Sequence, residues 1–177
     1  MHRTKVTEQL AEQLGDIGFP CQLYRDMKPL IYGKLLLNLN NALNAVADQP
    51  IKTQLENPKL RRLYAAAQRE WLQVAAAEGV ELGQFTVVKP AWMPAILSLP
   101  NWLFLRLAKA MLDIDPHARS SMWEDISQGR KTEIEFLNEA VVRRGEKVGL
   151  DMPVNRKISS LIHSLERGDS VTLEQLY

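Results

Sequence analysis

The chain has 177 residues, of which 46% are hydrophobic and 24% charged, and these proportions are typical of one globular domain with a buried core. A formal net charge of +1 gives no basic surplus of the kind that nucleic-acid-binding proteins carry, and no apolar run is long enough to span a bilayer. The single cysteine, Cys21, excludes an intramolecular disulfide and a thiolate metal cluster. We therefore expect a cytoplasmic protein that binds neither nucleic acid nor a membrane.

Helical spacing of apolar residues dominates the sequence and predicts an all-α fold. The predicted helices cover residues 4–14, 27–47, 58–78, 101–112, 120–128, 132–147 and 153–165. A short strand is predicted at 19–24, and the segment 84–100, which contains three prolines, is predicted to be a connector with turns.

The helix predicted at 27–47 carries polar residues among its leucines. At about 100° per residue, Lys34, Asn38 and Asn41 fall on one stripe about 10 Å long, whereas Asn40 and Asn44 lie off it. The opposite side of the helix is apolar, at Leu35, Leu36, Leu39, Ala42 and Leu43. Because asparagine is a poor helix former, we expect the stripe to form hydrogen bonds. It either bonds a neighbouring helix or loop, or forms a polar groove for a small oxygen-rich anion.

A second group of polar residues lies at 120–138. Ser120 is a predicted N-cap. Ser120 and Ser121 begin a predicted helix, whose free backbone N–H groups favour an anion. Glu133 begins the next predicted helix, where the helix dipole favours a carboxylate, and ordinary capping is its alternative role. We expect no metal site, because the acidic residues around His117 lie beside a proline in a segment typical of a solvated loop.

Together, the two groups resemble the C-terminal domain of the ketopantoate reductase (2-dehydropantoate 2-reductase) family. The resemblance rests on GKLLLNLNNAL at 33–43, SSMWEDISQGRKTEIEFLN at 120–138 and GLDMPVN at 149–155, and it covers roughly residues 7–165. It implies an all-α domain similar to the C-terminal domain of 6-phosphogluconate dehydrogenase. It also implies the NADPH-dependent reduction of a 2-oxo acid, such as 2-dehydropantoate, in pantothenate biosynthesis.

The resemblance implies roles for five residues. Lys34 matches the catalytic lysine, and Glu133 matches the acid that holds the hydroxyl and keto groups of the substrate. Asn38, Asn41 and Ser121 match substrate-binding residues, Asn41 at a spacing one residue shorter than in the family. Hydride addition to a ketone builds negative charge on its oxygen, so a cation and hydrogen-bond donors there lower the barrier. A lysine among amides and leucines is expected to lose solvation, which would make it a better proton donor.

The nucleotide-binding domain of the family carries a Gly-x-Gly-x-x-Gly run after a strand, and this sequence has no such run. Residues 1–25 are therefore expected to be the tail of a nucleotide-binding domain, and residues 26–177 a helical domain for substrate binding and dimerisation. The chain alone is expected to bind no NADP(H) and to be inactive. Two alternatives stay open: a non-catalytic helical interaction module, and a subunit completed in trans by a nucleotide-binding partner.

Overall fold

The computed structural model describes residues 5–109 and 115–177, and in these residues it contains helices and no strand, which confirms the all-α prediction. The α-helices are α1 (Lys5–Asp16), α2 (Lys28–Ala47), α3 (Ile51–Glu56), α4 (Pro58–Ala77), α5 (Met93–Leu97), α6 (Asn101–Leu107), α7 (Ser121–Ser127), α8 (Asn138–Lys147) and α9 (Pro153–Glu166). Short 3-10 helices are η1 (Pro90–Trp92), η2 (Ile134–Phe136) and η3 (Leu173–Leu176). None of the helices in the described residues has the length and hydrophobicity that crossing a membrane requires.

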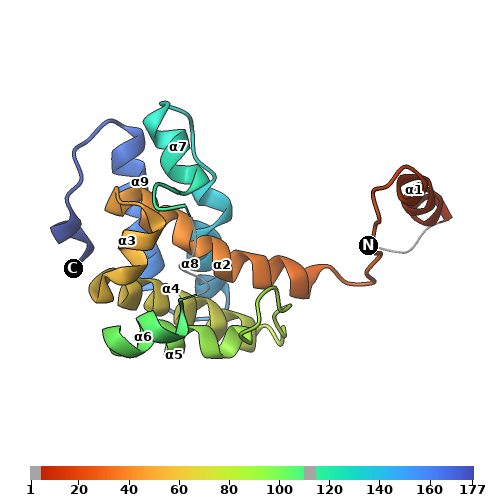
Figure 1. Cartoon of the computed structure of the whole chain (residues 1–177), viewed down its shortest axis with the longest axis horizontal. Helices are drawn as coiled ribbons and strands as arrows, with labels where there is room; N and C mark the ends of the chain where they lie inside the picture. The colour runs from red at the N-terminus through yellow and green to blue at the C-terminus, as the bar shows by residue number, and fades with distance from the viewer. Residues whose placement is uncertain (1–4, 110–114) are drawn as a thin grey trace.

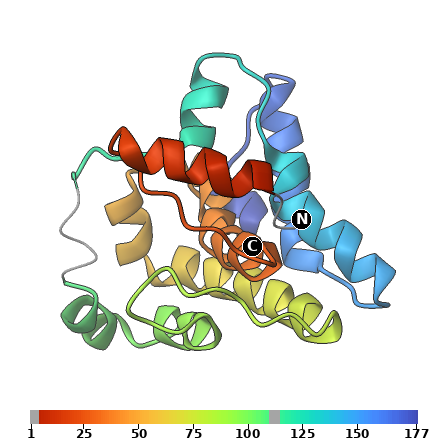
Figure 2. The ribbon, with the colours of Figure 1, turned by 90° about the vertical axis from the view of Figure 1, so that its right-hand side faces the viewer.

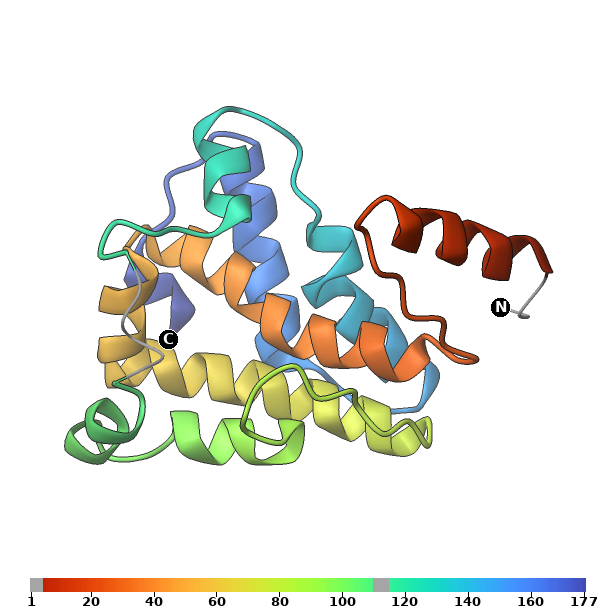
Figure 3. The ribbon, with the colours of Figure 1, turned by 45° about the vertical axis from the view of Figure 1, so that its right-hand side comes forward.

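The helix α2 lies at the centre of the fold and packs against α4, α7 and α9 (Figure 3). Its apolar side is the predicted one, since Leu36, Leu39 and Leu43 are fully buried. Each such leucine contributes about 1.5–3 kcal/mol by leaving water. On α4, the indole N–H of Trp71 donates to the Tyr32 carbonyl at 2.9 Å, and this bond fixes the first half of α2 against α4.

A close backbone contact holds the turn of α2 that precedes Lys34. The loop after α4 approaches so closely that a Cβ atom on Gly33 would lie 2.0 Å from the carbonyl oxygen of Gly83. The Gly83 N–H donates to the Pro29 carbonyl at 2.7 Å, which ties the same loop to the start of α2. Glycine at position 33 therefore permits a backbone contact that a Cβ atom would block, and a Cβ on Gly83 would meet Leu30 and Pro29 at a tight 3.0–3.2 Å.

The helix α1 lies beyond the N-terminal end of α2, apart from the other helices (Figure 1), and it lies in front of them when this side faces the viewer (Figure 2). It has no buried residue, and Val6 and Leu10 are more than half exposed. The segment 19–24, which was predicted to be a strand, is irregular. A strand needs a neighbouring strand for its backbone N–H and C=O groups, and the described residues contain no strand.

Two further predictions were wrong in detail. The segment predicted as a connector contains η1 and α5, because prolines near helix starts suit the first turn, whose N–H groups need no intrahelical partner. The predicted helix 132–147 is divided, so Glu133 does not begin an α-helix and α8 starts only at Asn138. The break lies at Leu137, with φ −107° and ψ −104°. The end of the predicted helix 101–112 lies outside the described residues, and α6 ends at Leu107.

Candidate functional site

The polar stripe lies on one continuous helix, as predicted. Lys34 is exposed, and Asn38 and Asn41 are half-buried on the same side of α2. No described residue forms a hydrogen bond or an ion pair with these three side chains. The expected desolvation of Lys34 is wrong for this chain, because its neighbours leave the side chain open to water.

The two asparagines off the stripe have a different environment. Asn44 is fully buried, and its Nδ2 donates to the Gln54 side-chain oxygen at 2.8 Å. Its Oδ1 accepts the backbone N–H of Ser120 at 2.8 Å. Gln54 in turn donates to Asn40 Oδ1 at 2.7 Å. These amides are structural, since they satisfy one another inside the protein, where an unpaired polar group is costly.

The start of α7 is fixed next to Asn41. The Ser120 hydroxyl accepts the Trp123 N–H at 3.2 Å, which confirms Ser120 as the N-cap. The same hydroxyl donates to the Asn41 carbonyl at 2.9 Å. Ser121 is the next residue along the chain, and it is exposed with no bonded side-chain partner among the described residues. The structure thus places Ser121 beside the Asn41 end of the stripe.

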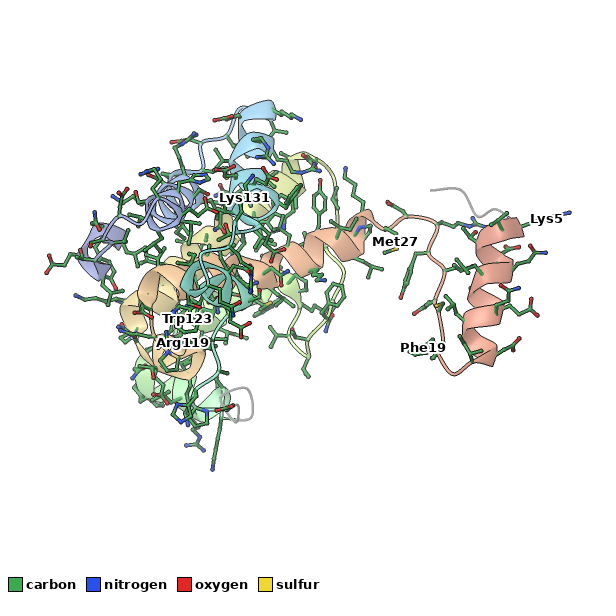
Figure 4. The ribbon with its side chains drawn as sticks, turned by 90° about the horizontal axis from the view of Figure 1, so that it is seen from above. Lys5, Phe19, Met27, Arg119, Trp123 and Lys131 are labelled. Carbon is green, nitrogen blue, oxygen red and sulfur yellow. The ribbon has the colours of Figure 1, made fainter. Side chains whose placement is uncertain are left out.

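A clamp of three side chains holds this junction. Asp48, just past the end of α2, accepts hydrogen bonds at 2.7 Å from both the Arg119 guanidinium and the Trp123 indole. The Arg119 guanidinium also lies 4.2 Å from the Trp123 ring, in a cation–π contact. Figure 4 shows Arg119 and Trp123 together, at the end of α2 opposite to Met27. The position of Ser121 is therefore set by the fold.

Glu133 is connected to α2 less directly than Ser121 is. Its side chain is exposed and bonds no described residue, whereas its neighbours Thr132 and Ile134 are buried. Thr132 is bonded to Glu166 on α9, and α9 packs against α2. The bonds of Ser120 to α2 thus place Ser121 next to the Asn41 end of the stripe. Glu133 is connected to α2 through a second helix, α9.

A charged cluster at the other end of α2 was missed by sequence reasoning. The Tyr32 hydroxyl donates to Glu78, and Arg144 donates to Tyr32 at 2.7 Å and to Glu78 at 3.1 Å. Burial and the hydrogen bond to Glu78 raise the pKa of Tyr32 to about 12. Burial would raise the pKa of Glu78, but the bonds from Tyr32 and Arg144 outweigh it and hold that pKa below its usual value. The residues lie far apart in sequence, so helical periodicity carried no signal for the cluster.

In the described ranges, 5–109 and 115–177, no three His, Cys, Asp or Glu side chains are grouped as a metal ion would need. Asp113, near the predicted loop at His117, lies outside the described residues.

The fold is that of the helical half of longer enzymes with known structures. A PanE/ApbA family ketopantoate reductase from Ralstonia eutropha superimposes with a TM-score of 0.73 and 25% identity, over 98% of this chain and 51% of that one. A ketopantoate reductase from Staphylococcus aureus, described as dimeric, superimposes with a TM-score of 0.70 and 20% identity, over 96% of this chain and 53% of that one. The class of protein is therefore a helical domain of the ketopantoate reductase fold.

The sequence comparison identifies the family. The family model "Ketopantoate reductase PanE/ApbA C terminal" matches residues 26–166, and the chain belongs to this family. A 2-dehydropantoate 2-reductase from Archaeoglobus fulgidus is 28% identical over 162 residues, which cover 91% of this chain and 48% of that enzyme. The chain spans about half the length of the curated relatives it matches. The resemblance predicted from the sequence is thereby confirmed.

Proposed function

We propose that the chain is the substrate-binding and catalytic half of a ketopantoate-reductase-like oxidoreductase, which reduces a 2-oxo acid such as 2-dehydropantoate with NADPH. The observation that carries the proposal is the stripe on α2. Lys34, Asn38 and Asn41 share one side of a well-packed helix, and no described residue bonds the polar atoms of their side chains. Half-buried amides without a protein partner are available to a polar ligand.

Each residue of the proposed site has a role that suits the chemistry of its side chain. NADPH would supply the hydride, and no residue of this chain is assigned to the cofactor. As negative charge develops on the ketone oxygen, the Lys34 ammonium stabilises it and transfers a proton, which Lys34 regains from solvent. The amides of Asn38 and Asn41 and the Ser121 hydroxyl donate to the carboxylate and oxygen atoms of the acid. Glu133 accepts from the substrate hydroxyl.

The proposal also covers the domain organisation of the chain and its partners. Residues 1–25 are assigned to the tail of a nucleotide-binding domain and residues 26–177 to the helical domain. The exposed apolar residues of α1, Val6 and Leu10, support a further domain or subunit that covers them. We propose that the chain alone binds the acid without reducing it, that a nucleotide-binding partner in trans would complete the site, and that the chain forms a homodimer in the cytoplasm, as the relative described as dimeric suggests.

Calorimetric titration of the 177-residue chain with 2-dehydropantoate tests the site. Lys34→Ala and Asn38→Ala should each weaken binding about tenfold or more, because a hydrogen bond to a charged group contributes about 1.5–3 kcal/mol. Lys147→Ala is the matched control, since Lys147 is exposed near the end of α8 and should leave the affinity unchanged.

Two results would contradict the proposal. Equal affinities of the Lys34 and Lys147 variants would remove the stripe from the site. If the folded chain binds no 2-oxo or 2-hydroxy acid while it still self-associates, the non-catalytic interaction module is the better description.

A further inference from the structure

The two neighbours of Glu133 are fixed, although its own side chain is free. The backbone N–H of Thr132 donates to Glu166 Oε1 at 3.0 Å, and the Thr132 hydroxyl donates to the same oxygen at 2.8 Å. That hydroxyl also accepts the Ile134 N–H at 3.3 Å, and the Ile134 side chain is buried. The backbone on both sides of Glu133 is therefore held, and one carboxylate oxygen of Glu166 holds it.

The other oxygen of Glu166 is bonded to a histidine. Glu166 Oε2 lies 2.8 Å from His163 Nδ1, one turn earlier on α9. The opposite ring nitrogen, His163 Nε2, is hydrogen-bonded to Glu139 on α8. A neutral imidazole has one N–H, whereas an imidazolium has two. Because both nitrogens face carboxylates, which only accept, the arrangement is complete only when His163 is protonated.

The charges around this group agree with a protonated His163. Hydrogen bonds to Glu139 and Glu166 raise the pKa of His163 above its ordinary value of 6.5. Burial would raise the pKa of Glu166, but bonds from Thr132 and His163 outweigh it and lower that pKa. Other charged side chains line two pockets beside these residues. The pocket at His163 is also lined by Arg143, Glu146, Arg156 and Arg167, and the pocket at Glu166 by Arg130 and Lys131.

We propose that Glu166 is a positioning residue for Glu133, which it holds through Thr132, and that His163 makes this support depend on pH. The proposal rests on the proposed role of Glu133 in binding the acid. Below the raised pKa of His163, the imidazolium donates to both carboxylates and the support is complete. As the pH rises through that value, one N–H is lost, two carboxylates face each other without the intervening charge, and the support weakens.

The first test uses the unmodified chain and NMR spectroscopy. The backbone amide signals of Thr132 and Glu133 should shift with pH, with the same midpoint as the imidazole signals of His163. In a His163→Gln variant this midpoint should disappear from both amides. If the wild-type amides do not follow the imidazole, the positioning inference is wrong, whether or not the chain binds an acid.

The second test compares the affinity for 2-dehydropantoate across pH in two variants. Glu166→Ala removes the acceptor of Thr132 and should weaken binding about tenfold at pH 6. Glu166→Gln keeps an acceptor oxygen but loses the charge, so it should recover most of the affinity while losing the pH step near the His163 pKa. Glu174→Ala, at an exposed carboxylate on η3, is the matched control and should retain both.

The outcomes separate the two proposals. Wild-type chain that binds no acid, with Thr132 and His163 titrating together, contradicts the proposed function and supports the positioning. Binding that is equal in Glu166→Ala and Glu174→Ala, with both variants folded by circular dichroism, overturns the positioning and leaves the proposed function intact.

Discussion

Asn40 and Asn44 lie one turn apart on α2, and the protein uses the side-chain amides of both. Asn38 and Asn41 lie on the same helix, and their side-chain amides bond no described residue. Asparagine lowers helix stability slightly at each of these positions, and a hydrogen bond to its side-chain amide offsets that cost. For the first pair the bond comes from within the fold. For the second pair the compensation must come from water or a ligand, which is why we assign them to the site.

Substitution separates these two classes of asparagine. Asn44→Ala should lower the free energy of unfolding by about 2–4 kcal/mol, because it leaves buried partners such as the Ser120 N–H and the Gln54 oxygen without a bond. Asn38→Ala should lower it by less than about 1 kcal/mol, because it orphans no described group. Urea unfolding measures both values. Equal losses would mean that Asn38 also has a structural partner.

The stripe itself followed from helix geometry, since 100° per residue places Lys34, Asn38 and Asn41 together on any helix through this segment. The partners of Asn44 did not, because Gln54 and Ser120 lie 10 and 76 residues further along the chain. The resemblance supplied the roles of Ser121 and Glu133, which periodicity could not. The bond between Thr132 and Glu166, on which the proposed support of Glu133 rests, could not be predicted either, because it joins residues 34 apart.

At the scale of elements, the helices predicted at 27–47, 58–78, 120–128 and 153–165 agree closely with α2, α4, α7 and α9, whereas the one predicted at 132–147 is divided. The predicted helix 58–78 is α4 (Pro58–Ala77), because proline at its start and a glycine after its end are strong local signals. The helix predicted at 132–147 is divided at Leu137, and Thr132, at its predicted start, bonds Glu166 on α9. Local propensity cannot report a bond of that kind.

The contact between α2 and the loop after α4 gives a prediction at this scale. Gly33→Ala should lower the free energy of unfolding by about 1–3 kcal/mol or more, because the new Cβ would lie 2.0 Å from a backbone oxygen, which cannot move aside as a side chain does. Thermal and urea unfolding measure the change. Binding of 2-dehydropantoate should also weaken, since Lys34 is the next residue.

Gly15→Ala is the matched control for this substitution. Gly15 lies in α1 with nothing within 4 Å of the added Cβ, so the change should be neutral or stabilise the helix by up to about 1 kcal/mol. If Gly33→Ala is as stable as Gly15→Ala, the loop does not press on α2 in solution.

At the scale of the whole molecule, the chain consists of a packed helical body and a separate N-terminal segment. The buried core runs from Tyr32 to Leu176, and α1 contributes no residue to it. Figure 4 shows Lys5 and Phe19 well away from the body, on the far side of Met27. The family model begins at residue 26, next to the start of α2. The body should therefore be stable without α1.

Removal of residues 1–24 tests this division. The shortened chain should unfold with a free energy within about 0.5 kcal/mol of the full chain, because the described residues in the removed segment, 5–24, are mostly exposed. Removal of residues 171–177 is the control, since it takes away Leu176, which is 5% exposed, and should cost about 1.5–3 kcal/mol although it removes fewer residues. Urea unfolding of the three chains measures the difference. A loss above about 2 kcal/mol on removing residues 1–24 would show that α1 packs on the body in solution, and the domain boundary at residue 25 would then be wrong.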